Sequence, residues 1–171
     1  VAADGVRAEP HITPAALHRR RVLDGSVAAS LRTMMRAVVT TGFYILSGGA
    51  PETDGPPGAI AIGRALQQAG YQVWYVSDKH ALFTLEGELQ NGARVLEFPI
   101  TDERASQAFA RKLLGDIRPS VLISIERCGM TRDGRYLNMR GRDISQYTAR
   151  LDHLFRGPAP SVGIGDGGNE I

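Results

Sequence analysis

The chain has 171 residues, of which 43% are apolar and 22% are charged, ordinary values for one globular domain with a sizeable core. Its formal net charge of +2 gives no strong field, so we expect neither nucleic acid nor a membrane as a partner; no apolar run reaches the roughly 18 residues of a membrane span. The single cysteine, Cys128, excludes an internal disulfide framework and fits a reducing compartment, so we expect a cytoplasmic protein, or one of the mitochondrial matrix if the source is eukaryotic.

The first part of the chain, residues 1–36, is predicted to be an N-terminal helical segment, and residues 37–171 an α/β domain. Two short helices are expected in that segment, at Pro14–Leu23 and Ser26–Arg36, separated by Asp24-Gly25. The chain starts without an initiator methionine and stops directly after a dense group of polar residues. We therefore expect the α/β domain to be truncated on its C-terminal side.

The remaining chain alternates between apolar runs that predict strands and amphipathic stretches that predict helices. The predicted strands are residues 37–46, 71–76, 94–98, 120–125 and 161–164. The predicted helices are residues 59–69, 79–89, 102–117 and 144–155. Asp133-Gly134, in the polar stretch between the fourth strand and the last helix, suggests a hairpin tip.

This order of elements predicts an α/β fold with a mainly parallel sheet and helices on both faces. Right-handed crossovers would bring the C-terminal end of every strand to one edge of the sheet, where ligands of such folds bind. Three loops rich in polar groups follow the first, fourth and fifth predicted strands. We therefore expect these loops to meet and to form the functional site.

The first loop follows residue 46 and contains the sequence ETDGPPGA from Glu52 to Ala59. Asp54 could hold a metal ion, or it could simply cap the helix that follows. The backbone N–H groups at the start of that helix could also face an anion. The loop lacks the lysine of a phosphate-binding GxxxxGK[ST] sequence, which argues against an ATP-type site.

The second loop begins with Glu126, which stands at the end of a buried strand, where a carboxylate needs a partner or a function. Four arginines follow in the same stretch and suit the binding of carboxylate or phosphate, although several could be solvated. They are Arg132, Arg135, Arg140 and Arg142. Cys128 could act as a nucleophile, but no histidine lies near it in sequence.

The third loop, GIGDGGNEI from Gly163 to Ile171, is the densest polar cluster of the chain. Its glycines would let the backbone approach a ligand, and Asp166, Asn169 and Glu170 supply the hard oxygen donors that Mg²⁺ or Mn²⁺ prefers. The segment is similar to the GDGxND metal loop of haloacid dehalogenase-type phosphatases. The Asp-x-Asp nucleophile loop of those enzymes is missing from this sequence.

Five motifs together resemble the D-glutamate cyclase family, in the same order and with similar spacing over residues 37–171. They are TGFYI (41–45), ETDGPPGA (52–59), ISIERCG (123–129), DGRYLNMRGRDI (133–144) and IGDGGNEI (164–171). The resemblance implies conversion of D-glutamate to 5-oxo-D-proline with loss of water, by a lyase. The carboxylates of the three loops lead us to expect assistance by Mg²⁺ or Mn²⁺. The implied partner is a small anionic metabolite, D-glutamate above all, and the protein could be a homo-oligomer.

The predicted site draws on all three loops and assigns three kinds of role. The predicted catalytic residues are Glu126, Asp166 and Glu170. The predicted metal ligands are Asp54, Glu126 and Asp166. The predicted substrate-binding residues are Thr41, Gly42, Thr53, Gly55, Arg127, Arg140, Gly167, Gly168 and Asn169.

Within this set, Glu126 or Asp166 would be the base that removes a proton from the substrate amine, and Arg127 or Arg140 would hold the α-carboxylate. Two other functions use the same features. One is a metal-dependent hydrolase or phosphatase acting on a different anion with the same carboxylates. The other is a non-catalytic nucleotide- or metabolite-binding module, for which glycine-rich loops at a switch point would be sufficient.

Overall fold

A computed structural model describes residues 35–171 of the chain, and these residues form a five-stranded sheet in the order β5-β4-β1-β6-β7. Every neighbouring pair in this sheet is parallel. The strands are β1 (Arg36–Thr41), β4 (Gln72–Ser77), β5 (Arg94–Glu97), β6 (Val121–Ile125) and β7 (Ser161–Ile164). The predicted parallel α/β fold is confirmed.

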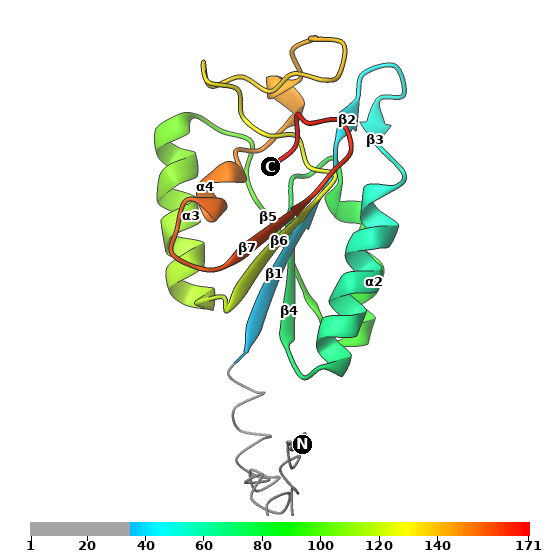
Figure 1. Cartoon of the computed structure of the whole chain (residues 1–171), viewed down its shortest axis with the longest axis vertical. Helices are drawn as coiled ribbons and strands as arrows, with labels where there is room; N and C mark the ends of the chain where they lie inside the picture. The colour runs from blue at the N-terminus through cyan, green and yellow to red at the C-terminus, as the bar shows by residue number, and fades with distance from the viewer. Residues whose placement is uncertain (1–34) are drawn as a thin grey trace, which may run out of the picture.

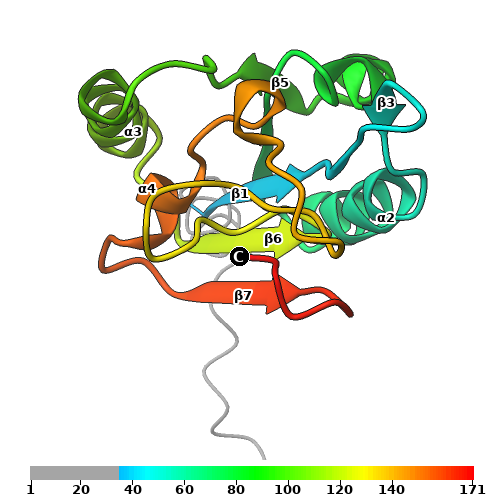
Figure 2. The same ribbon diagram turned by 90° about the horizontal axis from the view of Figure 1, so that it is seen from above.

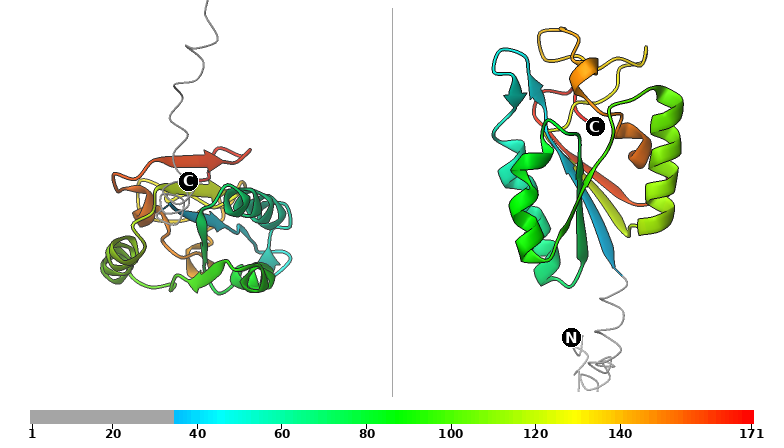
Figure 3. Two further views of the ribbon diagram at one scale, coloured as in Figure 1. Left: turned by 90° about the horizontal axis from the view of Figure 1, so that it is seen from below. Right: turned by 180° about the vertical axis from the view of Figure 1, so that it is seen from behind.

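Helices cover both faces of the sheet, as predicted, with α2 (Gly55–Gln68) on one face and α3 (Glu103–Ile117) and α4 (Asp152–Phe155) on the other (Figures 1 and 3). Each face has its own apolar core because side chains of a buried strand alternate between the two sides. Val38 packs toward α3 with Leu113, whereas Val39 packs toward α2 with Ala59. No helix among residues 35–171 is long and apolar enough to cross a membrane.

The strand order places a topological switch point at the centre of the sheet, between β1 and β6. The chain runs from β1 outward through β4 to β5, and then returns to add β6 and β7 on the opposite side of β1. Parallel α/β sheets bind ligands where the strand order reverses in this way. The loops after β1, β6 and β7 all lie at this edge of the sheet (Figures 1 and 2).

The first predicted strand is too long. β1 ends at Thr41 because Gly42 has a φ of +108°, and the chain then forms a separate hairpin from β2 (Tyr44–Ile45) and β3 (Ala50–Pro51). The first predicted helix starts too late. α2 begins at Gly55 and is capped by Asp54. Prolines fit in its first turn because the N–H groups there have no partner within the helix.

Two predicted helices are wrong. Residues 79–89 form 3₁₀ turns, η2 (Leu82–Thr84) and the start of η3 (Glu86–Asn91), with Gly87 weakening any longer helix. Residues 144–155 contain only a 3₁₀ turn, η4 (Ser145–Tyr147), and the short α4. Between them the backbone N–H and C=O of Ala149 bond Asp78 and Arg127, so neither is free for a helical ladder.

Other elements agree closely with the sequence. Asp102 caps α3 by accepting a hydrogen bond from the Ala105 N–H, and the hairpin tip at Gly134 is formed with a φ of +79°. Of the predicted N-terminal helices, Pro14–Leu23 lies outside the described residues. Ser26–Arg36 does so as well, except for its last residues, and there Arg36 begins β1. The proposed division at residue 36 stays a prediction.

Candidate active site

A cavity of about 190 Å³ opens at the switch point of the sheet. One wall is acidic, a second is apolar and comes from the β2 hairpin, and the third is the polar segment after β6. Its lining residues are Phe43, Ile45, Leu46, Ser47, Glu52, Glu126, Asn138, Met139, Arg140, Arg142, Asp166, Gly167, Asn169 and Glu170.

Three carboxylates converge on this cavity. Glu126, Asp166 and Glu170 each offer an oxygen atom, and these atoms lie within 4.8 Å of one another. Glu126 follows β6, whereas the other two belong to the glycine-rich loop after β7, so the pairing of these two strands brings them together. The structure therefore unites Glu126 and Asp166, as predicted from their positions after parallel strands; their chemical roles stay predictions.

The backbone at Glu126 has a conformation that is rare for a residue with a side chain, a left-handed φ of +45°. Its N–H donates a hydrogen bond to the Ile164 carbonyl, which continues the pairing of β6 with β7. Partial burial raises the pKa of the Glu126 carboxyl above its usual range, and repulsion from Asp166, Asp54, Glu170 and Glu52 raises it further. A carboxyl group with a raised pKa is better suited to exchange protons near neutral pH.

The glycines of the third loop allow the Glu170 side chain to fold back over its own backbone. The Gly167 N–H donates to Glu170 Oε1 at 2.9 Å. A methyl group added at Gly165 would lie 2.6 Å from Glu170 Cγ, and one at Gly167 would lie 2.8 Å from Glu170 Oε1. Side chains at either position would displace the carboxylate, so these glycines are required by a close approach.

The third loop is held against the second by backbone contacts. Cys128 and Glu170 form an antiparallel bridge, with the Gly129 N–H bonded to the Asn169 carbonyl. The Asn169 side chain donates to the Leu137 carbonyl at 3.0 Å, so this predicted substrate ligand also joins the two loops. Asn169 and Gly167 line the cavity, whereas Gly168 is exposed and is not part of its wall.

Asp54 lies near the cluster but is not part of the group of three. Its carboxylate accepts a hydrogen bond from the Gly55 N–H at 2.8 Å and so caps α2, which was the structural alternative. Its charge still reaches the site, because it contributes to the raised pKa of both Glu126 and Glu52. The structure groups Glu170, rather than Asp54, with Glu126 and Asp166 as possible metal ligands.

Four of the predicted substrate-binding residues are buried and do not line the cavity, and their contact with a substrate stays a prediction. Thr41, Gly42 and Gly55 are buried where β1 meets α2 and the loop after β4. Arg127 is only 1% exposed, and its guanidinium forms an ion pair with Asp78 at 2.6 Å. Thr53 is exposed and lines a separate groove beside Phe83. Arg140 is exposed and lines the cavity, so it can reach a bound anion.

The sequence indicated Glu52 as a polar residue of the first loop, but neither Glu52 nor the apolar wall was among the predicted site residues. Glu52 lines the cavity, and burial followed by repulsion from Asp54 raises the pKa of its carboxyl. Phe43, Ile45 and Leu46 form the apolar side because the chain leaves the sheet at Gly42 instead of continuing as a strand. The available signal for this bend in the sequence was Gly42 itself, because only glycine easily adopts the positive φ that the bend requires.

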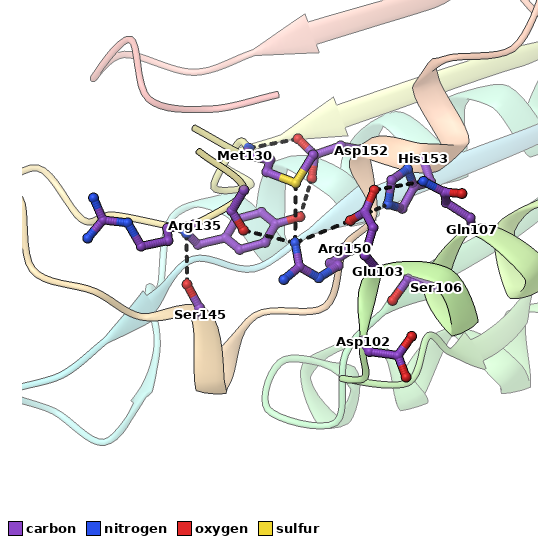
Figure 4. Close-up of polar contacts among 12 residues, drawn as sticks. Asp102, Glu103, Ser106, Gln107, Met130, Arg135, Ser145, Arg150, Asp152 and His153 are labelled. Atoms are coloured by element: carbon purple, nitrogen blue, oxygen red, sulfur yellow. Dashed lines mark hydrogen bonds and ion pairs between the residues drawn. The ribbon is translucent and has the colours of Figure 1, made fainter. Parts of the chain in front are cut away.

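The segment over the cavity is tied to α3 by a polar network (Figure 4). Asp152 accepts hydrogen bonds from the Met130 N–H and from the Tyr136 hydroxyl, and burial raises the pKa of that hydroxyl well above its usual range. Arg150 donates to the Gly134 carbonyl and pairs with Glu103 of α3 at 3.4 Å. These contacts fix the loop that carries Asn138, Arg140 and Arg142.

A parallel α/β sheet with a carboxylate-lined cavity at its switch point is typical of enzymes that act on small molecules. Residues 12–171 match the family model described as "D-glutamate cyclase-like, C-terminal", so the chain belongs to the D-glutamate cyclase-like family.

A curated relative supports the same family. The chain is 33% identical over 160 residues to a protein named "D-glutamate cyclase, mitochondrial" from Homo sapiens. The match covers 83% of this chain and 26% of the human protein, so the chain spans about a quarter of the length of this relative.

Proposed function

We propose that this domain converts D-glutamate to 5-oxo-D-proline and water in the cavity at the switch point. The observation that carries the proposal is the convergence of Glu126, Asp166 and Glu170 beside Arg140, in a chain related to a protein named D-glutamate cyclase. We also propose that it acts in the cytoplasm, or in the mitochondrial matrix if the source is eukaryotic.

The donor set of the cavity fits a divalent cation such as Mg²⁺ or Mn²⁺. Both ions prefer carboxylate oxygens, and oxygens of Glu126, Asp166 and Glu170 lie within 4.8 Å of one another. The raised pKa of Glu126 reflects, after burial, negative charges that a cation would offset. When bound, such an ion would polarise the γ-carboxyl group of the substrate.

The chain's own residues would orient the substrate and move its protons. Arg140 would hold the α-carboxylate by charge-assisted hydrogen bonds, with Arg142 beside it in the cavity wall. The apolar wall at Phe43 and Leu46 would pack against the two methylene groups and keep the substrate curled, which brings its amine near its γ-carboxyl carbon.

Glu126 would accept a proton from the α-ammonium group through the carboxylate oxygen that does not face the ion, because its side chain lines the cavity. The freed amine attacks the γ-carboxyl carbon, a C–N bond forms and a C–O bond breaks. The two protons that nitrogen loses leave with the departing oxygen as water, so the base is regenerated and the products are the lactam and water.

The test is incubation of the intact protein with D-glutamate and Mn²⁺, following loss of the primary amine and formation of 5-oxoproline. Glu126→Gln and Asp166→Asn should each lower turnover by more than about 100-fold while the protein stays folded. Glu97→Gln is the matched control, because Glu97 is an exposed carboxylate of β5 outside the cavity. Unchanged activity in either site variant would remove that residue from the mechanism. Hydrolysis of a phosphate ester without cyclisation would support the hydrolase alternative instead.

A further inference from the structure

A buried ion pair lies next to the site without lining its cavity. Arg127 and Asp78 are paired at 2.6 Å with side chains only 1% and 3% exposed. Burying two charges costs free energy unless their geometry is good and further hydrogen bonds satisfy them, and an apolar pair of similar volume is often as stable. The pair is therefore weak evidence for stability alone, and its position directly after Glu126 suggests another role.

The pair joins four segments of the chain, which follow β1, β4 and β6 and precede α4. The Arg127 guanidinium donates to the Gly42 carbonyl after β1 and to the Ala149 carbonyl before α4, each at 2.9 Å. Asp78, after β4, accepts from the N–H groups of Ala149 at 3.2 Å and His80 at 3.1 Å. A planar fork of donors is required to reach these acceptors at once, which lysine cannot supply.

The main chain around Arg127 is constrained as tightly as its side chain. Glu126 holds its left-handed φ of +45°, a conformation that persists only where the surroundings enforce it. Its N–H bonds the Ile164 carbonyl, and the Arg127 carbonyl accepts from the Ile171 N–H at 2.8 Å, next to Glu170. Both neighbours of the turn are thus fixed, one to the sheet and one to the third loop.

We propose that Arg127 is a positioning residue, whose fork to Asp78, Gly42 and Ala149 enforces the turn at Glu126 and so aims the Glu126 carboxylate at Asp166 and Glu170. The inference deepens the proposed function and rests on it for its kinetic test. Arg127 acts through Glu126 and touches neither substrate nor ion. This role differs from direct binding of the α-carboxylate, which the sequence suggested.

The experiment compares Arg127→Met and Arg127→Lys with wild type in the intact protein. The methionine variant removes the fork, and the lysine variant keeps a positive charge facing Asp78 and protects the test if the first fails to fold. Arg64→Met is the control outside the cavity, because it breaks an ion pair of similar length, 2.7 Å, between a half-exposed arginine and the buried Glu88. All activities are expressed per folded molecule, from urea unfolding curves.

We expect kcat to fall about 100-fold in Arg127→Met with KM changed less than about threefold, since small misplacements of a catalytic group reduce the chemical step. The lysine variant should lose about 10-fold. By titration calorimetry the dissociation constant for Mn²⁺ should rise about 10-fold in Arg127→Met with unchanged stoichiometry, as is typical when support behind a ligand is removed. Arg64→Met should change neither constant.

Other outcomes overturn the proposal. A lowered unfolding midpoint with unchanged kcat and Mn²⁺ affinity would make Arg127 purely structural, and a raised KM with unchanged kcat would make it a substrate ligand. If wild type binds Mn²⁺ but does not cyclise D-glutamate, the proposed function fails, while the Mn²⁺ titration still decides the role of Arg127. If wild type does neither, a crystal structure of Arg127→Lys decides, because an unmoved Glu126 turn would refute the inference.

Discussion

Helix α2 packs tightly at Gly55 against Thr41 and Glu126, and this contact makes a sharp prediction. A methyl group at this position would lie 2.6 Å from Thr41 Oγ1 and 2.8 Å from Glu126 Cβ, both shorter than van der Waals contact. At Gly58, in the same helix, a methyl group would lie 3.6 Å from Ile125 Cγ2, an ordinary contact. The two glycines therefore form a matched pair with opposite expected effects.

Gly55→Ala should destabilise the protein by about 1–2 kcal/mol, because overpacking costs about 1–3 kcal/mol and the loss of glycine flexibility returns part of it. Gly58→Ala should stabilise it by about 0.5–1 kcal/mol, the usual gain of alanine over glycine inside a helix. The two free energies of unfolding should thus differ by about 1.5–3 kcal/mol. Because the clash at Gly55 involves Glu126, turnover of D-glutamate should fall in that variant alone.

Urea unfolding followed by fluorescence measures both effects, since Trp74 of β4 is the single tryptophan and packs beneath the Arg94 guanidinium. Unfolding slopes should be unchanged, so that the midpoints report stability. If Gly55→Ala proves as stable as Gly58→Ala, the packing of α2 against β1 and Glu126 described above is incorrect.

Three further predictions concern the charges and the thiol of the site. The folded-state pKa of Glu126 is raised above its ordinary value of 4.5. The stability that its protonated form contributes is therefore present below pH 4.5 and is lost as the pH rises through the raised pKa. Glu126→Gln should raise the urea midpoint at pH 8 and leave it nearly unchanged below pH 4.5. Mn²⁺ at 100 times its dissociation constant should stabilise wild type by about 2.7 kcal/mol, seen as a higher midpoint, and should not stabilise Asp166→Asn. Burial raises the pKa of Cys128 to about 12, so 5,5′-dithiobis(2-nitrobenzoate) should label it only after unfolding; rapid labelling of the folded protein would contradict its buried position.

The sheet was predictable because its signal is local. Buried parallel strands appear as short apolar runs, and β1, β4, β5, β6 and β7 all coincide with predicted runs. The helix expected at residues 144–155 failed for a long-range reason. Its apolar side chains Leu151 and Leu154 do enter the core, but the backbone of Ala149 serves Asp78 and Arg127, which are distant in sequence.

The site was predictable to the level of its loops, but not to the direction of each side chain. Glu126 and Asp166 each follow a predicted parallel strand, and their positions in the sequence are enough to predict that they lie at the same edge of the sheet. Arg127 follows Glu126 directly, and only the left-handed turn at Glu126 determines that the arginine enters the interior. Backbone dihedrals of this kind depend on tertiary contacts. The sequence alone therefore could not show that Arg127 forms a buried ion pair instead of binding substrate, or that Asp54 caps a helix instead of binding a metal ion.

The three carboxylates depend on one another unequally, because Glu126 is held by the sheet whereas Asp166 and Glu170 are held through the second loop. The loop after β7 is exposed up to Gly168, and its contacts run to Arg127, Gly129 and Leu137 of that second loop. A change that moves the second loop therefore shifts Asp166 and Glu170 relative to Glu126, whereas a change in α2 reaches only Glu126. Arg127→Met should accordingly weaken Mn²⁺ binding more than Gly55→Ala does, even where the two variants are equally destabilised. Equal losses of affinity would show that the third loop is positioned independently of the second.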